Sequence, residues 1–336
     1  MPGPPTAAGY PCCEATAAKR TANVPPVQYG VTGAAGFIGS HLCEELLRRG
    51  HEVIGFDCFT DHYDPAQKER NAADLDVQRV DLAVDELDFS ELDGLFHLAG
   101  QPGVRSFGDV FPLYAQRNIV ASQSVFQACV AAGTRVVLAS SSSVYGDAET
   151  YPTPETTPTR PLSPYGITKL ACEQLAYAYE REFGLDCVVL RYFTVYGPRQ
   201  RPDMAFTRLG MALACDGTFE LYGDGEQSRG LTFVSDAVDA TIRAMDSGAG
   251  TYNVGGATEA TMNEVIARFE RVAGRTLRLV RLEAVKGDVK RTNADTPRLR
   301  SELGWQPEVG IEEGIDAHWR WVESEARQRA GAGIRP

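Results

Sequence analysis

The sequence has no long apolar run, no metal-binding pattern and comparatively few basic residues. Hydrophobic residues make up 43% of its 336 positions. No stretch approaches the roughly 20 apolar residues that a membrane-spanning helix needs. The eight cysteines form no C-x-x-C pair and no cluster with histidine, so neither a zinc site nor a disulfide framework is expected. The net charge of −12 opposes nonspecific binding to nucleic acid or membrane, although a few local arginines can hold a small anion.

A signal peptide is also missing, and several cysteines lie inside apolar helix or strand patterns. We therefore expect free thiols in a reducing cytoplasm. Residues 1–24 are rich in Pro, Ala and Thr and have no periodicity, which predicts a disordered leader. The alternative, a transit peptide, has little support because only Lys19 and Arg20 are basic.

From Val27 onward, short apolar runs alternate with longer segments of helical periodicity. This alternation predicts an α/β fold with a Rossmann-type, doubly wound parallel sheet over residues 25–195, to which later segments also contribute. After residue 195 the regularity breaks, and residues 196–330 are expected to form mainly a smaller C-terminal α/β lobe. The expected strands are 28–32, 51–57, 77–81, 95–99, 135–141, 187–193, 218–222, 232–234 and 276–282, and the main expected helices are 37–49, 112–132, 164–183, 204–215, 261–273 and 311–323.

A glycine-rich segment, Gly33-Ala34-Ala35-Gly36-Phe37-Ile38-Gly39, connects the first predicted strand to the first predicted helix. Glycines at this position permit a tight turn, close approach of a pyrophosphate and close packing of helix on strand. Asp57 ends the second strand, where a carboxylate accepts hydrogen bonds from an adenine ribose and repels a 2′-phosphate. The pattern predicts a dinucleotide site that prefers NAD to NADP.

Two further strand ends carry residues suited to the same site. Ligands of α/β folds bind outside the carboxyl ends of the strands, so these residues are expected to line the cofactor site, although each alone also fits ordinary packing. They are Asp81, Leu82, Leu98, Ala99, Gly100 and Gln101.

Tyr165 and Lys169 are four residues apart in a predicted helix and therefore share one face. A lysine ammonium beside a phenol favours the phenolate, which can take a proton from a sugar hydroxyl. The run 140–143 consists of four serines at a predicted strand end, and one of their hydroxyls can share the same substrate oxygen. Alone, the Tyr/Lys spacing also fits a solvated helix face.

Three arginines are candidates for binding an anionic substrate. Arg229 follows a glycine turn and can grip a diphosphate bidentately. Arg201 lies in the loop after the last sheet strand, and Arg105 follows the fourth strand. For each of them, a solvated surface arginine is the alternative.

Together these residues resemble the extended short-chain dehydrogenase/reductase family, in its nucleotide-sugar epimerase/dehydratase branch, from about Val27 to about Gly314. The resemblance implies bound NAD, Tyr165 as the base and Lys169 as its electrostatic partner. It implies Ser141 as the hydroxyl that shares the substrate oxygen, with Ser142 as the other possible register. It also implies a cofactor role for Asn118 and Phe193, and a UDP-sugar site that includes Thr194, Met204, Asp288 and Arg291.

The residues just after the catalytic serine indicate the branch of the family. Related dehydratases and decarboxylases carry a carboxylate immediately before the Val-Tyr-Gly segment, whereas this chain has Ser142 and Ser143 there, which favours an epimerase. Residues 56–65, 103–105 and 193–205 are similar to UDP-glucuronate 4-epimerases, and Arg201 can pair with a sugar carboxylate. A UDP-glucose 4-epimerase is the nearest alternative, and a decarboxylase or 4,6-dehydratase is more distant.

The chain departs from the family pattern at two places. The segment Gln28-Tyr29-Gly30-Val31 replaces the usual aliphatic first strand, and Arg229-Gly230-Leu231 replaces the usual Arg-Asp-Phe. The resemblance further implies a homodimer formed through helices near 112–132 and 164–183. A buried core is the other explanation of the apolar faces of those helices.

Overall fold

The computed structural model describes residues 27–103, 108–284 and 289–331, so the predicted leader at 1–24 lies outside the described residues. The centre of the structure is a seven-stranded sheet in the order β10-β6-β5-β4-β1-β2-β3, with every neighbouring pair parallel. The predicted Rossmann-type sheet is thereby confirmed. Its strands are β1 (Gln28–Thr32), β2 (Glu52–Asp57), β3 (Val77–Arg79), β4 (Gly94–His97), β5 (Arg135–Ser141), β6 (Cys187–Tyr192) and β10 (Gly250–Val254).

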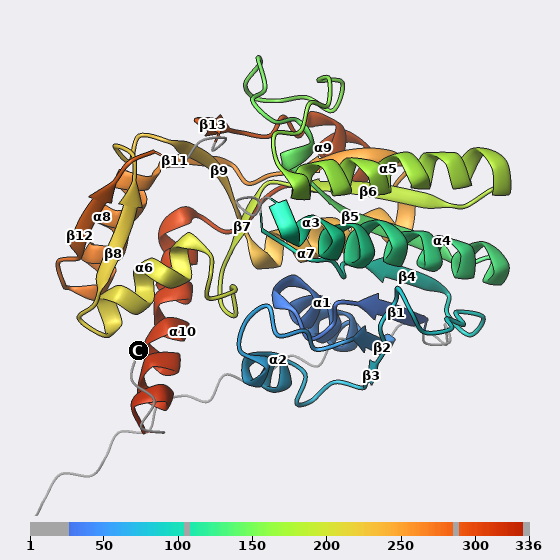
Figure 1. Cartoon of the computed structure of the whole chain (residues 1–336), viewed down its shortest axis with the longest axis horizontal. Coiled ribbons are helices and arrows are strands. Elements are labelled where there is room, and N and C mark those ends of the chain that lie inside the picture. The colour runs from blue at the N-terminus through green and yellow to red at the C-terminus, as the bar shows by residue number, and fades with distance from the viewer. Residues whose placement is uncertain (1–26, 104–107, 285–288, 332–336) are drawn as a thin grey trace, which may run out of the picture.

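Helices cover both faces of this sheet, which is why its strands are almost continuously apolar. On one face α4 (Ala121–Ala132) and α5 (Pro164–Phe183) lie side by side and bury Val125, Phe126 and Ala176 (Figure 1). On the other face α1 (Phe37–Arg48) packs against α7 (Val234–Ser247). Each fully buried Val, Leu or Phe side chain contributes about 1.5–3 kcal/mol, so these two layers are the main source of stability.

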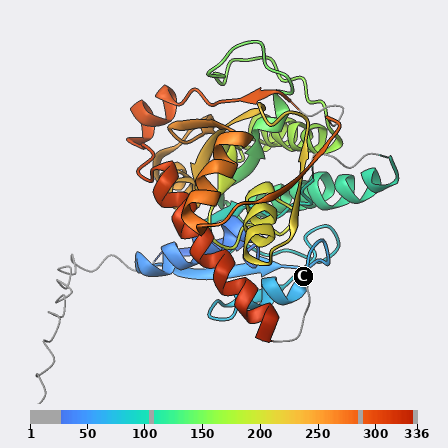
Figure 2. The same cartoon turned by 90° about the vertical axis from the view of Figure 1, so that its left-hand side faces the viewer.

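A second group of elements, the smaller lobe, lies beside the large sheet (Figure 1). Its helices α6, α8 and α10 pack on one another around Phe206, Phe269 and Trp319, and Figure 2 views them from their own side. In its two small sheets, β9 pairs with β7, β11 and β13, and β8 pairs with β12. The elements are β7 (Thr194–Tyr196), α6 (Ala205–Ala214), β8 (Thr218–Tyr222), β9 (Ser228–Phe233), β11 (Thr258–Thr261), α8 (Met262–Ala273), β12 (Arg278–Leu282), β13 (Arg291–Thr292) and α10 (Ile311–Gly331).

The chain returns from the smaller lobe to the large sheet, which the sequence pattern did not reveal in detail. The predicted strand piece at 232–234 is the end of β9 and the first residue of α7. After α7, β10 pairs with β6 and becomes an edge strand of the large sheet. The remaining helical segments are α2 (Pro65–Asn71), η1 (Gly108–Val110), α3 (Phe111–Tyr114), η2 (Ala115–Val120), η3 (Ser142–Val144) and α9 (Pro297–Leu303). Within the described ranges, no helix is long and apolar enough to cross a membrane.

The unusual first strand is accommodated by its neighbours. β1 is an interior strand of the sheet, hydrogen-bonded to β2 and β4. A Cβ atom on Gly30 would lie 2.5 Å from Leu92 and 2.6 Å from Leu95 side-chain atoms, so larger side chains next to the strand fill the space that an aliphatic residue would take. Tyr29 packs edge-on against Phe96. The departure from an aliphatic strand therefore changes the packing and leaves the pairing intact.

Candidate active site

The glycine turn after β1 has the geometry that close approach of a phosphate requires. Gly33 has a φ of +74°, and a Cβ atom on Gly39 would lie 2.1 Å from the Gly33 carbonyl oxygen. Side chains at either position would strain the turn or displace it. The helix α1 begins directly behind the turn, and its N-cap, Gly36, makes no side-chain capping bond. The N-terminal N–H groups of α1 are therefore not capped by the Gly36 side of the turn, and the positive end of the helix dipole can bind a phosphate.

Asp57 is buried at the end of β2 and is fixed by its neighbours. The N–H groups of Ala35 and Phe59 donate to its two carboxylate oxygens at 3.2 and 2.7 Å. The Nζ atom of Lys68, which the sequence pattern did not single out, lies 3.9 Å from Asp57 Oδ1. A carboxylate fixed in this position can accept hydrogen bonds from the ribose hydroxyls of a dinucleotide, and the adjacent glycine turn can bind its pyrophosphate. These residues therefore fit NAD.

A cavity of about 830 Å³ runs from this turn to the smaller lobe. It is lined by all six predicted strand-end residues, namely Asp81, Leu82, Leu98, Ala99, Gly100 and Gln101, and by Phe193, Thr194, Met204 and Arg229. Asn118 is not part of the lining but lies directly behind it. Its Oδ1 accepts from the Gln101 N–H at 2.6 Å and its Nδ2 donates to Thr168 at 2.9 Å, so it positions the loop after β4 against α5.

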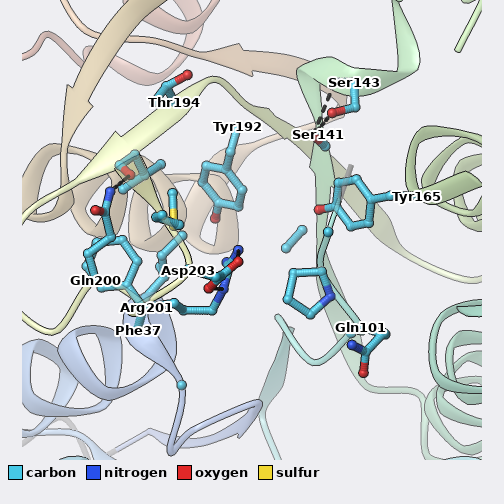
Figure 3. Close-up of a pocket in the computed structure, with 18 of the residues that line it drawn as sticks. Phe37, Gln101, Ser141, Ser143, Tyr165, Tyr192, Thr194, Gln200, Arg201 and Asp203 are labelled. Carbon is cyan, nitrogen blue, oxygen red and sulfur yellow. Dashed lines mark hydrogen bonds and ion pairs between the residues drawn. The ribbon is translucent and has the colours of Figure 1, made fainter. Parts of the chain in front are cut away.

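The predicted catalytic residues line one side of the cavity. Tyr165 and Lys169 occupy the first turns of α5, whose N-cap is Ser163. Lys169 is buried, lies 6.0 Å from the centre of the Tyr165 ring and donates to the Ala139 carbonyl at 2.8 Å. In Figure 3 the Tyr165 hydroxyl points into the pocket below Ser141. The lysine is thus held by the backbone of β5, near the phenol.

The serine run turns into a short helix at the end of β5. Ser141 caps η3, since its Oγ accepts from the Ser143 N–H at 3.1 Å, and the Ser141 hydroxyl donates to Ser143 Oγ at 3.1 Å. Both Ser141 and Ser142 line the cavity, as does Ser143. Three serine residues in succession therefore line this part of the cavity.

Arg201 also lines the cavity, from the loop between β7 and α6, and it is already paired. Its Nε and Nη2 atoms donate to the two carboxylate oxygens of Asp203 at 3.0 and 3.1 Å. His62 Nε2 lies 3.9 Å from the same carboxylate. Figure 3 shows Arg201 and Asp203 facing the space into which the Tyr165 hydroxyl points. Neither Asp203 nor His62 was singled out from the sequence.

The remaining predicted substrate residues differ in their surroundings. Arg229 donates to the carbonyls of Ser228 and Val289, at 2.8 and 2.7 Å, at one end of the cavity. Arg291 is outside the cavity lining and pairs with Glu259 at 2.7 Å. Arg105 and Asp288 lie outside the described residues.

A buried ion pair lies behind the serine run. Arg191 on β6 donates to both carboxylate oxygens of Glu173 on α5, at 3.0 and 2.7 Å, and to the Tyr145 hydroxyl at 2.8 Å. The Ser140 hydroxyl also bonds to Glu173. This network joins α5, which carries Tyr165, to the end of β5. Sequence reasoning missed it because its members are far apart in the chain.

Comparison with known proteins agrees with this geometry. Residues 30–255 match the model of the NAD dependent epimerase/dehydratase family. An uncharacterized UDP-glucose epimerase, YtcB, of Bacillus subtilis is 40% identical over 308 residues, which cover 88% of this chain and 97% of YtcB. A UDP-glucuronate 4-epimerase of Thermodesulfobacterium geofontis is 33% identical, over 87% of this chain and 95% of its own length.

Among solved structures, UDP-glucuronic acid 4-epimerase from Bacillus cereus, in complex with UDP-glucuronic acid and NAD, superposes with a TM-score of 0.86. The two sequences are 35% identical, and the match covers 89% of this chain and 100% of the other. The glycine turn, the held carboxylate and the Tyr/Lys pair thus occur in a fold shared with such enzymes. The chain belongs to the NAD-dependent epimerase/dehydratase family.

Proposed function

We propose that this protein is an isomerase that epimerises UDP-glucuronate to UDP-galacturonate at carbon 4, through a 4-keto intermediate. The observation that carries the proposal is a cavity lined by Tyr165 and Ser141 on one side and by Arg201 on another, with serines, Ser142 and Ser143, as the two residues after Ser141. The names of the Thermodesulfobacterium and Bacillus cereus relatives support the same substrate.

The cofactor is proposed to lie between the glycine turn and the catalytic pair. NAD, when bound, supplies the hydride acceptor and returns the hydride to the substrate. We propose that residues 25–195, with sheet contributions from later segments, form the NAD-binding domain and that residues 196–330 mainly bind the nucleotide sugar. The proposed cofactor residues are Gly33, Gly36, Phe37, Ile38, Gly39, Asp57, Asp81, Leu82, Leu98, Ala99, Gly100, Gln101, Asn118, Tyr165, Lys169 and Phe193.

Tyr165 acts as the base in this proposal. As a phenolate it takes the proton from the sugar 4-hydroxyl and later returns it, which is the work of a positioned acid/base group. Lys169 supplies the positive charge that stabilises the phenolate, and its bond to the Ala139 carbonyl holds that charge in place. Ser141 bridges the reacting oxygen, with Ser142 as the alternative catalytic serine. Oxidation and re-reduction require no further acid.

Arg201 is proposed to bind the substrate carboxylate. The 4-keto form of a uronic acid is a β-keto acid, which loses carbon dioxide when the breaking bond aligns with the carbonyl π system. A guanidinium that holds the carboxylate near the plane of the ketone opposes this alignment. The Arg201→His variant should therefore release more UDP-pentose, and an unchanged product ratio together with unchanged affinity would exclude the role. The other proposed substrate residues are Arg105, Ser141, Thr194, Met204, Arg229, Asp288 and Arg291.

A UDP-glucose 4-epimerase using the same residues is the second candidate. The pairing of Arg201 with Asp203 favours it, because a neutral hexose leaves that pair undisturbed. The name of the Bacillus subtilis relative points the same way.

Separate incubations of the purified protein with UDP-glucuronate, UDP-glucose and a TDP-hexose, followed by chromatography of the products, distinguish these candidates. The proposal predicts conversion of UDP-glucuronate at the highest rate. Faster conversion of UDP-glucose would favour the second candidate. A dehydrated or decarboxylated main product would exclude both.

We further propose a cytoplasmic homodimer. Several large apolar side chains remain exposed on the adjacent helices α3, η2 and α5, namely Phe111, Leu113, Val120, Ile167, Tyr177 and Phe183. Large exposed apolar side chains on adjacent helices are a feature of protein–protein interfaces. Size-exclusion chromatography with light scattering tests the dimer: a species of twice the chain mass is expected, and a monomer at micromolar concentration would contradict it.

A further inference from the structure

A chain of polar contacts runs along the cavity wall to Arg201. Arg117 donates to the side-chain oxygen of Gln101 at 2.8 Å, and the Gln101 amide nitrogen lies 2.9 Å from His62 Nδ1. His62 Nε2 in turn lies 3.9 Å from Asp203, which pairs with Arg201. The members come from the loops that follow β2 and β4, from η2 and from the loop before α6. All five side chains line the cavity.

The contacts fix the tautomer of His62. An arginine has only donors, so Gln101 must turn its oxygen toward Arg117 and its NH₂ group toward His62. The His62 Nδ1 atom therefore accepts, which places the proton of a neutral imidazole on Nε2. Nε2 is buried and has no hydrogen-bond partner among the described residues. His62 thus presents an unused N–H donor to Asp203.

Asp203 occupies one edge of the Arg201 guanidinium, the Nε and Nη2 atoms, which is suited to gripping a carboxylate. Both of its oxygens accept from the guanidinium, in the bidentate arrangement that carboxylates prefer. Burial alone would raise the pKa of Asp203, but the His62 and Arg201 side chains lower it below its ordinary range. Asp203 is therefore a carboxylate at neutral pH and competes with any incoming one.

We propose that Asp203 occupies, in the free protein, the position on Arg201 that the substrate carboxylate takes. When a uronate binds to Arg201, the Asp203 carboxylate instead accepts a hydrogen bond from His62. This inference rests on the proposed function. With a uronate bound, Arg201 pairs with the sugar and Asp203 accepts from His62 Nε2–H. With a neutral hexose, Asp203 stays on Arg201 and no charge is left unpaired. Asp203 and His62 are thus positioning residues that set the preference between uronate and hexose.

The backbone around Arg201 is held in place, so that side chains alone need to exchange. His41 on α1 bonds to the Pro198 carbonyl at 2.9 Å, and Gln67 on α2 donates to the Arg199 carbonyl at 3.2 Å. The Arg199 side chain also pairs with Glu44 on α1. The loop that carries Arg201 is therefore anchored on the helices next to the glycine turn. Asp203 Oδ2 and His62 Nε2 are 3.9 Å apart, so the exchange is proposed to involve these two side chains.

The Asp203→Asn variant gives the first test. Binding of UDP-glucuronate, UDP-glucose and UDP is measured by calorimetry on NAD-loaded protein in a Tyr165→Phe background, which prevents turnover. Removing the competing charge should tighten UDP-glucuronate binding by about two- to fivefold, the size of a partly exposed ion pair, and leave UDP-glucose and UDP within roughly twofold. Weaker or unchanged UDP-glucuronate binding would overturn the proposal, since it would mean that Asp203 only orients Arg201. Asp216→Asn, in an exposed pair with Arg275, is the matched control and should change none of these affinities.

A double-mutant cycle tests His62. The His62→Phe variant removes the receiving donor, so UDP-glucuronate should bind several-fold more weakly while UDP-glucose binds as before. When Asp203 is already Asn, the same replacement should have no effect on UDP-glucuronate. An equal loss in both backgrounds would show that His62 has a merely structural role and would overturn this part of the proposal.

Failure of this inference is distinguishable from failure of the proposed function. If the wild-type protein epimerises UDP-glucuronate but Asp203→Asn does not bind it more tightly, the proposed movement of Asp203 from Arg201 to His62 is wrong and the proposed function stands. If the wild-type protein converts UDP-glucose and neither binds nor converts UDP-glucuronate, the proposed function fails, and the exchange fails with it.

Discussion

Replacing Arg191 by Met is expected to destabilise this protein by about 3–5 kcal/mol, because it leaves the Glu173 carboxylate buried without its cationic partner. The two side chains are only 10% and 6% exposed, and they meet through two hydrogen bonds. Arg191 also donates to the Tyr145 hydroxyl, which keeps its bond to Asn253 when the arginine is lost. The main cost is therefore the unpaired carboxylate.

A second replacement separates this cost from loss of packing. In the Arg191→Met/Glu173→Leu double variant no charge remains buried, and buried ion pairs can often be replaced by apolar residues at little cost. The Ser140 hydroxyl then loses its partner Glu173, which costs about 1–3 kcal/mol. The double variant should thus be more stable than the Arg191→Met single variant, although it carries more changes.

Urea unfolding followed by far-UV circular dichroism measures the effect across the whole chain. Tryptophan fluorescence alone would not report on the whole chain, because all three tryptophans, 305, 319 and 321, lie near its C-terminal end. The control is Arg48→Met, which breaks an exposed pair with Glu45 and should barely shift the midpoint. A double variant less stable than the single variant, or a single variant as stable as wild type, would refute the reasoning.

Three further predictions concern the cofactor turn, the base and a buried histidine. In the Gly39→Ala variant the new Cβ atom would lie 2.1 Å from the Gly33 carbonyl oxygen, so this variant should lose NAD. The nucleotide content of the purified protein measures this loss. The control is Gly310→Ala, whose Cβ atom meets no atom within 4 Å and which should retain NAD. Tyr165→Phe should lower kcat by about 10²–10⁴ in a product assay with no loss of bound NAD; a smaller loss would remove Tyr165 as the base. Burial lowers the pKa of His97 from 6.5 to about 3, so the unfolded chain binds this proton and the folded protein does not. Stability should therefore fall as the pH drops below 6.5, by about 2–3 kcal/mol at pH 4.5 from this group, and urea midpoints of a His97→Gln variant should fall less over the same interval.

Much of the fold was predictable because its signals are local. The strands of the large sheet are short apolar runs, and each boundary is set by nearby turn residues, as at Gly33 after β1. The Tyr165 and Lys169 pair needed only helical spacing and the cap at Ser163. By contrast, β10 is a short strand whose partner, β6, is distant in the sequence, and its place at the sheet edge depends on how α7 packs.

The part of the site that escaped prediction depends on contacts between distant segments. His62 resembles any solvated loop histidine until Gln101 and Asp203 are brought beside it. The sequence indicates Arg201 as a ligand for a sugar carboxylate, but an arginine and an aspartate two residues apart carry no signal of pairing, and the structure pairs them. The sequence therefore identifies the residue types of the site, whereas the charges around Arg201 become known only from the three-dimensional structure.

The central claim is that Tyr165 and Arg201 act on one bound uronic acid, and a proton NMR time course tests it most directly. Purified NAD-loaded protein is incubated with UDP-glucuronate, and the coupling of the sugar proton at carbon 4 is followed. We expect UDP-galacturonate to appear up to an equilibrium mixture, without a pentose signal, and no conversion by the Tyr165→Phe variant. Recovery of unchanged UDP-glucuronate by a protein that interconverts UDP-glucose and UDP-galactose would contradict it.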